Sequence, residues 1–151
     1  MRQGVRLGID AGKVRVGVAQ SDPSGLLATP VETIERESPD LLSKLQSLVV
    51  EKNVIEIVVG LPLNLSGVHT PSTENAIELA HAIASTTDVP VRMIDERLTT
   101  VSAHAALRQS GKKQRGTRSV IDQVAAVMVL QHALDSERAT GALPGIAVED
   151  L

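Results

Sequence analysis

The sequence predicts a single α/β domain with a mixed five-stranded sheet, three antiparallel strands followed by two parallel ones, and helices on both faces. Residues 5–34 contain three short runs of alternating apolar residues separated by turn sequences. Two later apolar runs each follow a helical pattern, and such a crossover makes the next strand parallel to its neighbour. The 151 residues are enough to bury one core.

The N-terminal strands are expected to form an antiparallel meander. In the first strand Val5, Leu7 and Ile9 alternate with other residues, and Gly12 and Lys13 form the turn that follows. The segment "SDPSG" separates the second strand from the third. Connections this short join antiparallel neighbours, and the strands are placed at residues 5–10, 14–20 and about 26–34.

The rest of the chain alternates helices with strands. The two parallel strands are expected at "VIEIVVG" and "VPVRMID", because nearly continuous apolar runs are typical of buried strands. Four helices are expected. The first begins at the Ser38–Pro39 pair and the second at Pro71. The third begins at Thr99 or Thr100 and ends near Ser110, and the fourth begins at Ser119 and covers about residues 120–138. Residues 1–138 would form the domain, and residues 139–151 a flexible C-terminal tail.

The composition limits how the chain can bind and react. It contains no Phe, Tyr or Trp, so a nucleic acid would be held by charge, backbone amides and metal rather than by stacking on aromatic rings. It contains no Cys, which excludes disulfides, thiolate metal sites and cysteine nucleophiles. No signal-peptide pattern and no long apolar run is present, so we expect a cytoplasmic protein without a membrane partner.

Positive charge is concentrated in residues 108–118, "RQSGKKQRGTR", although the net charge of the chain is −3. This segment holds five cations and no acid, whereas the remainder of the chain is strongly acidic. One interpretation is a phosphate-binding loop, and the alternative is a solvated linker between two helices. The five cations are Arg108, Lys112, Lys113, Arg115 and Arg118.

Three acidic positions are expected to meet near one edge of the sheet. Asp10 ends the first strand, Asp95 and Glu96 end the fifth, and Asp122 lies in the first turn of the last helix. The carboxyl ends of parallel strands share an edge, where α/β proteins bind their ligands. Clustered carboxylates repel one another unless a cation joins them, and oxygen-only ligands suit Mg²⁺ or Mn²⁺. Two such ions can promote phosphodiester hydrolysis by water.

Each acid also has a simpler explanation. Asp10 can be a turn residue at the end of a strand. Glu96 can pair with Arg97 or Arg92 on the surface. Asp122 can be the acid of a capping box that begins at Ser119.

Four segments, in order, resemble the motifs of the YqgF/RuvX family over about residues 5–137. They are "GIDAGKVRVGVAQSDPSGLLATPVETI", "IVVGLPLNLSG", "DERLTTVSA" and "VIDQVAAVMVLQHALD". The resemblance implies an RNase H-like fold related to Holliday junction resolvases. It further implies a metal-dependent nuclease, with one or two Mg²⁺ or Mn²⁺ ions, that processes the 5′ end of the 16S rRNA precursor.

The resemblance also implies residue roles. Asp10, Glu96 and Asp122 match the catalytic, metal-binding acids. The supporting group comprises Asp95, Arg97 and Thr99 of the "DERLTT" signature together with Gly12 and Arg15 of the first motif. The family often has Thr-Lys before that arginine, where this chain has Lys13-Val14. Lys13 and the five cations of residues 108–118 would bind nucleic acid, and the Gly12 turn would let backbone approach a phosphate.

Other functions remain open at this stage. A Holliday junction resolvase would use the same chemistry on four-way DNA, as a two-fold dimer with two sites. The pattern "DxGxxxxG" also occurs in the actin, Hsp70 and sugar-kinase superfamily, which needs two such domains around a cleft. A non-catalytic module could bind nucleic acid through the same basic segment. Structured RNA is the preferred partner, branched DNA the alternative, and the chain could act as a monomer or homodimer.

Overall fold

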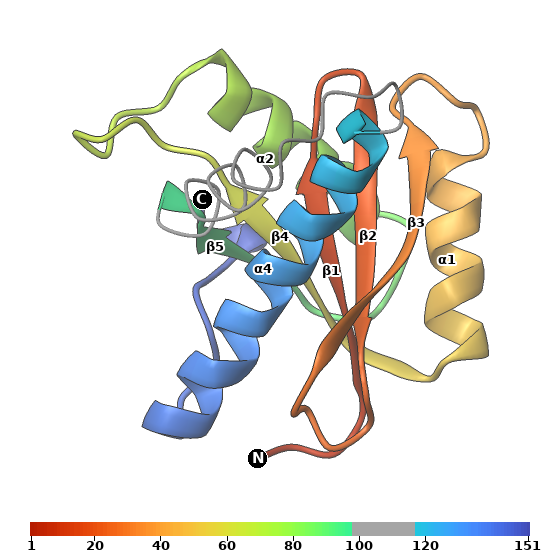
Figure 1. Cartoon of the computed structure of the whole chain (residues 1–151), viewed down its shortest axis with the longest axis vertical. Helices are drawn as coiled ribbons and strands as arrows, with labels where there is room; N and C mark the ends of the chain where they lie inside the picture. The colour runs from red at the N-terminus through yellow and green to blue at the C-terminus, as the bar shows by residue number, and fades with distance from the viewer. Residues whose placement is uncertain (98–116) are drawn as a thin grey trace.

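The computed structural model describes residues 1–97 and 117–151, which contain one six-stranded sheet with helices on both faces (Figure 1). The sheet order is β3-β2-β1-β4-β5-β6. β1, β2 and β3 are antiparallel neighbours, β4 and β5 run parallel to β1, and β6 is antiparallel to β5. The strands are β1 (Val5–Ala11), β2 (Arg15–Ser21), β3 (Ala28–Glu35), β4 (Val54–Leu61), β5 (Val91–Asp95) and β6 (Ile146–Ala147).

The helices divide between the two faces of the sheet. α1 (Leu41–Glu51) and α2 (Pro71–Ala84) cover one face, where long aliphatic side chains form the larger core. Of the described helices, α4 (Thr117–Thr140) crosses the other face, over a smaller core that includes several alanines (Figure 1). A short 3₁₀ helix, η1 (Val148–Asp150), ends the chain. Within the described ranges, no helix is both long and apolar enough to cross a membrane.

The alternation along β1 decides which residues meet α4. Leu7 and Ile9 are buried in the core under α1 and α2. Gly8 faces the other way, because a Cβ added to it would lie 2.6 Å from the Cβ of Leu130 on α4. Side chains alternate between the faces of a strand, so Arg6 and Asp10 share the α4 face with Gly8. This alternation places Asp10 under the helix that carries Asp122.

The predicted fold class is confirmed, with one strand more than expected. The three antiparallel strands and the two parallel ones lie within a few residues of their predicted bounds. The sixth strand comes from the residues expected to form a flexible tail. Ile146 pairs with Met93, and Val148 is buried in the larger core. The prediction missed this strand because two residues are too short to show an alternating pattern.

The helix boundaries differ more than the strands do. α1 begins at Leu41 with Asp40 as N-cap, not at the Ser38–Pro39 pair, because the Ser38 carbonyl accepts a hydrogen bond from the Leu41 N–H in a turn before the helix. α2 begins at Pro71 as predicted, behind a capping box between Thr70 and Thr73. The last helix runs from Thr117 to Thr140, longer at both ends than predicted. The helix predicted after Thr99 lies outside the described residues.

Candidate active site

Three acidic residues lie in a row at one end of the α4 face, with Asp10 in the middle. On one side, Asp10 pairs directly with Gly17 of β2. On the other side, Ile9 pairs with Val59 of β4, which places Gly60 beside Asp10 in the sheet. Asp10 therefore has a glycine on each side, and both neighbouring strands leave open space above the sheet at this level.

Glu96 and Asp122 fill the space that the two glycines leave. A Cβ on Gly60 would overlap the Oε2 atom of Glu96, so the Glu96 carboxylate lies directly over β4. A Cβ on Gly17 would overlap the backbone carbonyl oxygen of Asp122, so α4 lies directly against β2 there. The Glu96 N–H also donates to the Leu61 carbonyl at 3.3 Å, which holds this residue at the end of β4.

Burial and neighbouring negative charge together raise the pKa values of two acids in the row. The pKa of Asp10 rises from 3.8 to about 8, first because the carboxyl is buried and then because Glu96 and Asp122 are nearby. Burial also raises the pKa of Asp122, while a hydrogen bond from Arg15 opposes this rise. A buried acid between two others is stabilised in its ionised form by an added cation, so the row favours cation binding.

Arg15 provides the one positive group bonded to the row in the described part of the chain. Its Nε donates to Oδ2 of Asp122 at 2.9 Å, from β2 to α4. This contact contradicts the capping-box explanation of Asp122, because α4 already includes Thr117 and Ser119 lies inside it. Asp122 is thus a helix residue whose carboxylate binds a strand rather than its own helix terminus.

Glu96 is not a member of a surface pair with its neighbouring arginines. Its side chain is buried. Arg97 binds Asp95 through its Nε, at 2.8 Å from Oδ2, and thereby lowers the pKa of Asp95. Arg92 donates instead to the backbone carbonyls of Pro144 and Gly145. Asp95 and Arg97 therefore form a local ion pair beside the row.

The remaining predicted site residues are only partly described. Lys13 is exposed in the β1–β2 turn. Gly12 makes that turn possible, because a Cβ there would overlap the Arg15 carbonyl oxygen. Arg118 lies in the first turn of α4, but its side chain is outside the described part. Thr99, Arg108, Lys112, Lys113 and Arg115 also lie outside the described residues.

The oxygen donors of the row are of the type that divalent cations prefer, but the described side chains are not close enough together to form a binding site. The donors of the row are carboxylate oxygens, which Mg²⁺ and Mn²⁺ prefer, and the pKa of its middle acid is raised by burial and by the two acids beside it. Among residues 1–97 and 117–151, however, no three His, Cys, Asp or Glu side chains are grouped closely enough to hold an ion. Asp122 is the member already engaged by an arginine.

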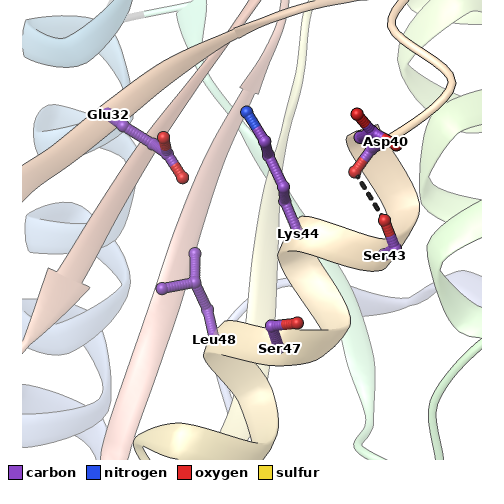
Figure 2. A pocket seen from close by; sticks show the side chains of 6 residues that line it. All are labelled: Glu32, Asp40, Ser43, Lys44, Ser47 and Leu48. Carbon is purple, nitrogen blue, oxygen red and sulfur yellow. Dashed lines mark hydrogen bonds between the residues drawn. The ribbon is translucent and has the colours of Figure 1, made fainter.

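A shallow hollow of about 340 Å³ lies on the opposite face of the sheet, between β3 and α1 (Figure 2). Glu32 lines it, and Glu32 pairs with Val18, whose side chain is buried in the larger core under α1 and α2. The hollow is therefore separated from Asp10 by the sheet itself. Its other lining residues are Asp40, Ser43, Lys44, Ser47 and Leu48.

Sequence reasoning missed two contributors to the site. Gly60 was treated as the end of a strand, although its missing side chain makes room for Glu96. Glu35 was not considered, yet it lies opposite Arg15 in the β2–β3 pair, and its charge raises the pKa of Asp122. A glycine inside a strand pattern is a usable signal of close approach, whereas the Glu35 contact depends on strand register.

Comparison with known families matches this architecture. The family model described as "RuvX: Holliday junction resolvase" matches residues 4–136. The chain belongs to the RuvX family. A RuvX relative from Leifsonia xyli subsp. xyli, named "Putative pre-16S rRNA nuclease", is 56% identical over 151 residues, 99% of this chain and 97% of its own. A relative of the same name from Nocardioides sp. strain JS614 is 54% identical, covering 99% of each chain.

Solved structures share the fold of this RuvX chain. Thermus thermophilus RuvC in complex with a Holliday junction substrate aligns with a TM-score of 0.59 and 19% identity, over 93% of this chain and 99% of that one. A second Thermus thermophilus RuvC structure aligns with a TM-score of 0.54 and 16% identity, over 90% of this chain and 97% of that one. At this identity the likeness establishes the RNase H-like fold alone.

Proposed function

We propose that this RuvX chain is a metal-dependent nuclease that hydrolyses phosphodiester bonds, with the 5′ end of the 16S rRNA precursor as its substrate. The observation that carries the proposal is the row of three acids, in which burial and the charges of Glu96 and Asp122 raise the pKa of Asp10 to about 8. The names of its full-length relatives support the choice of substrate. Such an enzyme would work in the cytoplasm.

Each acid has a distinct role in this proposal. Asp10, Glu96 and Asp122 would hold one or two Mg²⁺ or Mn²⁺ ions, which when bound activate water and stabilise the leaving oxygen. Asp10 lies between the other two and would contribute to every arrangement of the ions. Asp95 and Arg97 would fix the end of β5, so that Glu96 remains over Gly60.

Phosphate groups of the substrate would be held by cations at the same edge. Lys13 is exposed in the turn that follows Asp10, and Arg15 begins the next strand. The basic segment 108–118 would extend this contact along the nucleic acid. Because the chain has no aromatic residue, recognition would depend on backbone shape and charge rather than on base stacking.

Holliday junction resolution is the second candidate, favoured by the description of the RuvX family and by the fold shared with RuvC. It would require a two-fold dimer, so that two copies of the acid row cut opposite strands. A third possibility is a module that binds RNA without cutting it.

The deciding experiment compares cleavage of end-labelled 16S leader RNA and of a four-way DNA junction, each with Mn²⁺, Mg²⁺ or chelator. Wild-type protein is run beside Asp10→Asn and beside Asp135→Asn, a control with the same charge change on the exposed side of α4. We expect metal-dependent cuts in the RNA, full activity in the control, and a loss of at least about a thousandfold in Asp10→Asn.

The other outcomes assign the alternatives. Cuts in the junction alone, lost in Asp10→Asn, would make the chain a resolvase. RNA binding without cleavage would leave the binding module. Equal activity in Asp10→Asn and wild type would remove the acid row from the mechanism.

A further inference from the structure

The contact between Arg15 and Asp122 has a consequence for how the acid row is assembled. Arg15 lies on β2 and Asp122 on α4, and their side chains are 24% and 16% exposed. The backbone of Asp122 is fixed against Gly17, so only its side chain can move between partners. Because Oδ2 is bonded to Arg15, only Oδ1 of this acid is left for a cation, and the guanidinium offsets part of its charge.

The engagement of Asp122 by Arg15 bears on how the acid row could hold an ion. In the described part of the chain, no three acidic or histidine side chains form an ion-binding group. Glu96 lies over Gly60 and its charge acts on Asp10, so these two acids already lie near one another. Asp122 is the third acid, and its bond to Arg15 takes one of its two oxygens and part of its negative charge from a shared cation.

We propose that Arg15 is a positioning residue that couples nucleic-acid binding to metal binding, an inference that rests on the proposed nuclease function. Without nucleic acid, Arg15 holds Asp122 away from the cation. A phosphate of the substrate competes for the guanidinium of Arg15 and releases Asp122 to the cation. The complete metal site therefore forms only when a nucleic acid is bound.

The chemistry of the guanidinium makes this exchange favourable. Arginine forms bidentate hydrogen bonds with phosphate, and its charge is retained at any physiological pH. Arg15 follows the turn that bears Lys13, so a phosphate that approaches Asp10 meets both cations. Glu35 lies opposite Arg15 in the β2–β3 pair and can keep the arginine near this edge after it leaves Asp122.

Coupling of this kind is reciprocal. If bound RNA tightens Mn²⁺ binding by some factor, Mn²⁺ must tighten RNA binding by the same factor. Removal of Arg15 should abolish the increase in Mn²⁺ affinity that RNA causes, because Asp122 would then be available to the cation with or without RNA. The variant should therefore bind Mn²⁺ more tightly than wild type when no RNA is present.

The test measures Mn²⁺ affinity by electron paramagnetic resonance of free Mn²⁺, with and without 16S leader RNA made non-cleavable by phosphorothioate linkages. Wild type, Arg15→Gln and Arg36→Gln are compared. Arg36 follows β3 and its N–H donates to the Val14 carbonyl, so its loss removes the same charge near the same hairpin. Within the described residues Arg36 makes no ion pair.

Without RNA, we expect Arg15→Gln to bind Mn²⁺ at least about fivefold more tightly than Arg36→Gln. With RNA, wild type should gain a similar factor and Arg15→Gln should gain none. Equal Mn²⁺ affinity in the two variants would overturn the coupling, and so would an RNA effect retained in Arg15→Gln. If Arg15→Gln fails to fold, wild type alone still tests the proposal, because an Mn²⁺ affinity independent of RNA contradicts it.

Failure of the coupling is distinguishable from failure of the nuclease function. Asp10→Asn should lose most Mn²⁺ binding, with or without RNA. If it binds Mn²⁺ as wild type does, the ion is not at the acid row and both proposals fall. If Mn²⁺ binds at Asp10 but is indifferent to Arg15, only the coupling falls, and RNA cleavage remains to decide the function.

Discussion

The α4 face of the sheet carries two charged clusters, one at each end, and they differ in how many of their acids are paired with arginines. At one end, Glu137 of α4 accepts hydrogen bonds from Arg2 and Arg6, and Arg2 also binds Glu56 at 3.1 Å. We call these four residues the paired cluster. At the other end lies the row of Asp10, Glu96 and Asp122. β1 contributes to both, through Arg6 and Asp10 on either side of Gly8.

The difference lies in charge balance. The paired cluster has two cations and two anions, and the pKa of Glu137 is lowered by its arginine partners. Among the described residues, the acid row has three acids and one bonded arginine, and the pKa of Asp10 is raised to about 8. A cluster with equal numbers of cations and anions satisfies its charges within the protein, whereas an excess of acids is typical of a site that binds a cation. Both clusters are largely buried, so burial does not distinguish them. The ratio of cations to acids does, and it marks the paired cluster as structural and the acid row as the candidate site.

The largest effect on stability is expected from Glu137→Ala. This change leaves Arg6, whose side chain is only 1% exposed, without its acidic partner. Removing one member of a buried ion pair typically costs about 3–5 kcal/mol. Urea unfolding should show this loss, while cleavage by the folded fraction at low temperature stays near wild type. A stability unchanged within about 1 kcal/mol would contradict the scaffold role.

The two clusters should respond oppositely to pH when the protein is free of metal. Between its ordinary pKa of 3.8 and its folded value of about 8, Asp10 keeps a proton that the unfolded chain releases, so its contribution to stability is lost as pH rises. Between pH 5 and pH 8 the loss amounts to at most about 4 kcal/mol, because each pH unit contributes about 1.4 kcal/mol. Glu137 has a lowered pKa, so its contribution is lost as pH falls instead.

Asp10→Asn isolates the first of these effects. Unfolding free energies measured in chelator should fall from pH 5 to pH 8 in wild type and stay flatter in Asp10→Asn. The variant should thus be the more stable protein at pH 8, although we expect it to be inactive as a nuclease. Parallel curves for the two proteins would show that Asp10 is not protonated in the fold.

The two glycines beside Asp10 should separate stability from activity. In Gly17→Ala the new methyl group meets the backbone of α4, so we expect a loss of about 1–3 kcal/mol as the helix shifts. In Gly60→Ala it meets the end of the Glu96 side chain, which can move, so we expect a loss below about 1 kcal/mol with a marked fall in cleavage. Thermal unfolding and cleavage rates check both, and a Gly60→Ala enzyme of full activity would contradict the placement of Glu96.

The smallest effect is expected for an exposed ion pair on the same helix. Asp135 binds Arg138 at 2.9 Å, with both side chains at least 40% exposed. Such pairs contribute about 0–1 kcal/mol, so Asp135→Asn should unfold within about 0.5 kcal/mol of wild type. A larger loss would mean that exposure does not distinguish this pair from the paired cluster.

The sequence predicted most of the fold because its signals are local. Alternating residues in β1 and β2, the apolar run of β4 and the start of α2 at Pro71 all correspond to elements of the structure. The prediction that Asp10 and Glu96 share an edge followed from strand direction alone, and the influence of the Glu96 charge on Asp10 agrees with it.

The details that assemble the site are not local, and the sequence did not reveal them. The Arg15–Asp122 bond joins residues 107 positions apart, and it depends on how α4 crosses β2. The role of Gly60 depends on which side chain lies above it. Strand register and helix packing determine such contacts, and neither can be derived from periodicity.

The short strand β6 protects the sheet from other molecules. Without it, β5 would be the outermost strand, and its free N–H and C=O groups could pair with a strand of a neighbouring chain. Ile146 and Ala147 occupy this position, and the burial of Val148 keeps them there. A chain cut after Thr140 would keep all three acids of the row but would leave the edge of β5 uncovered, so we expect it to self-associate more readily than the whole chain.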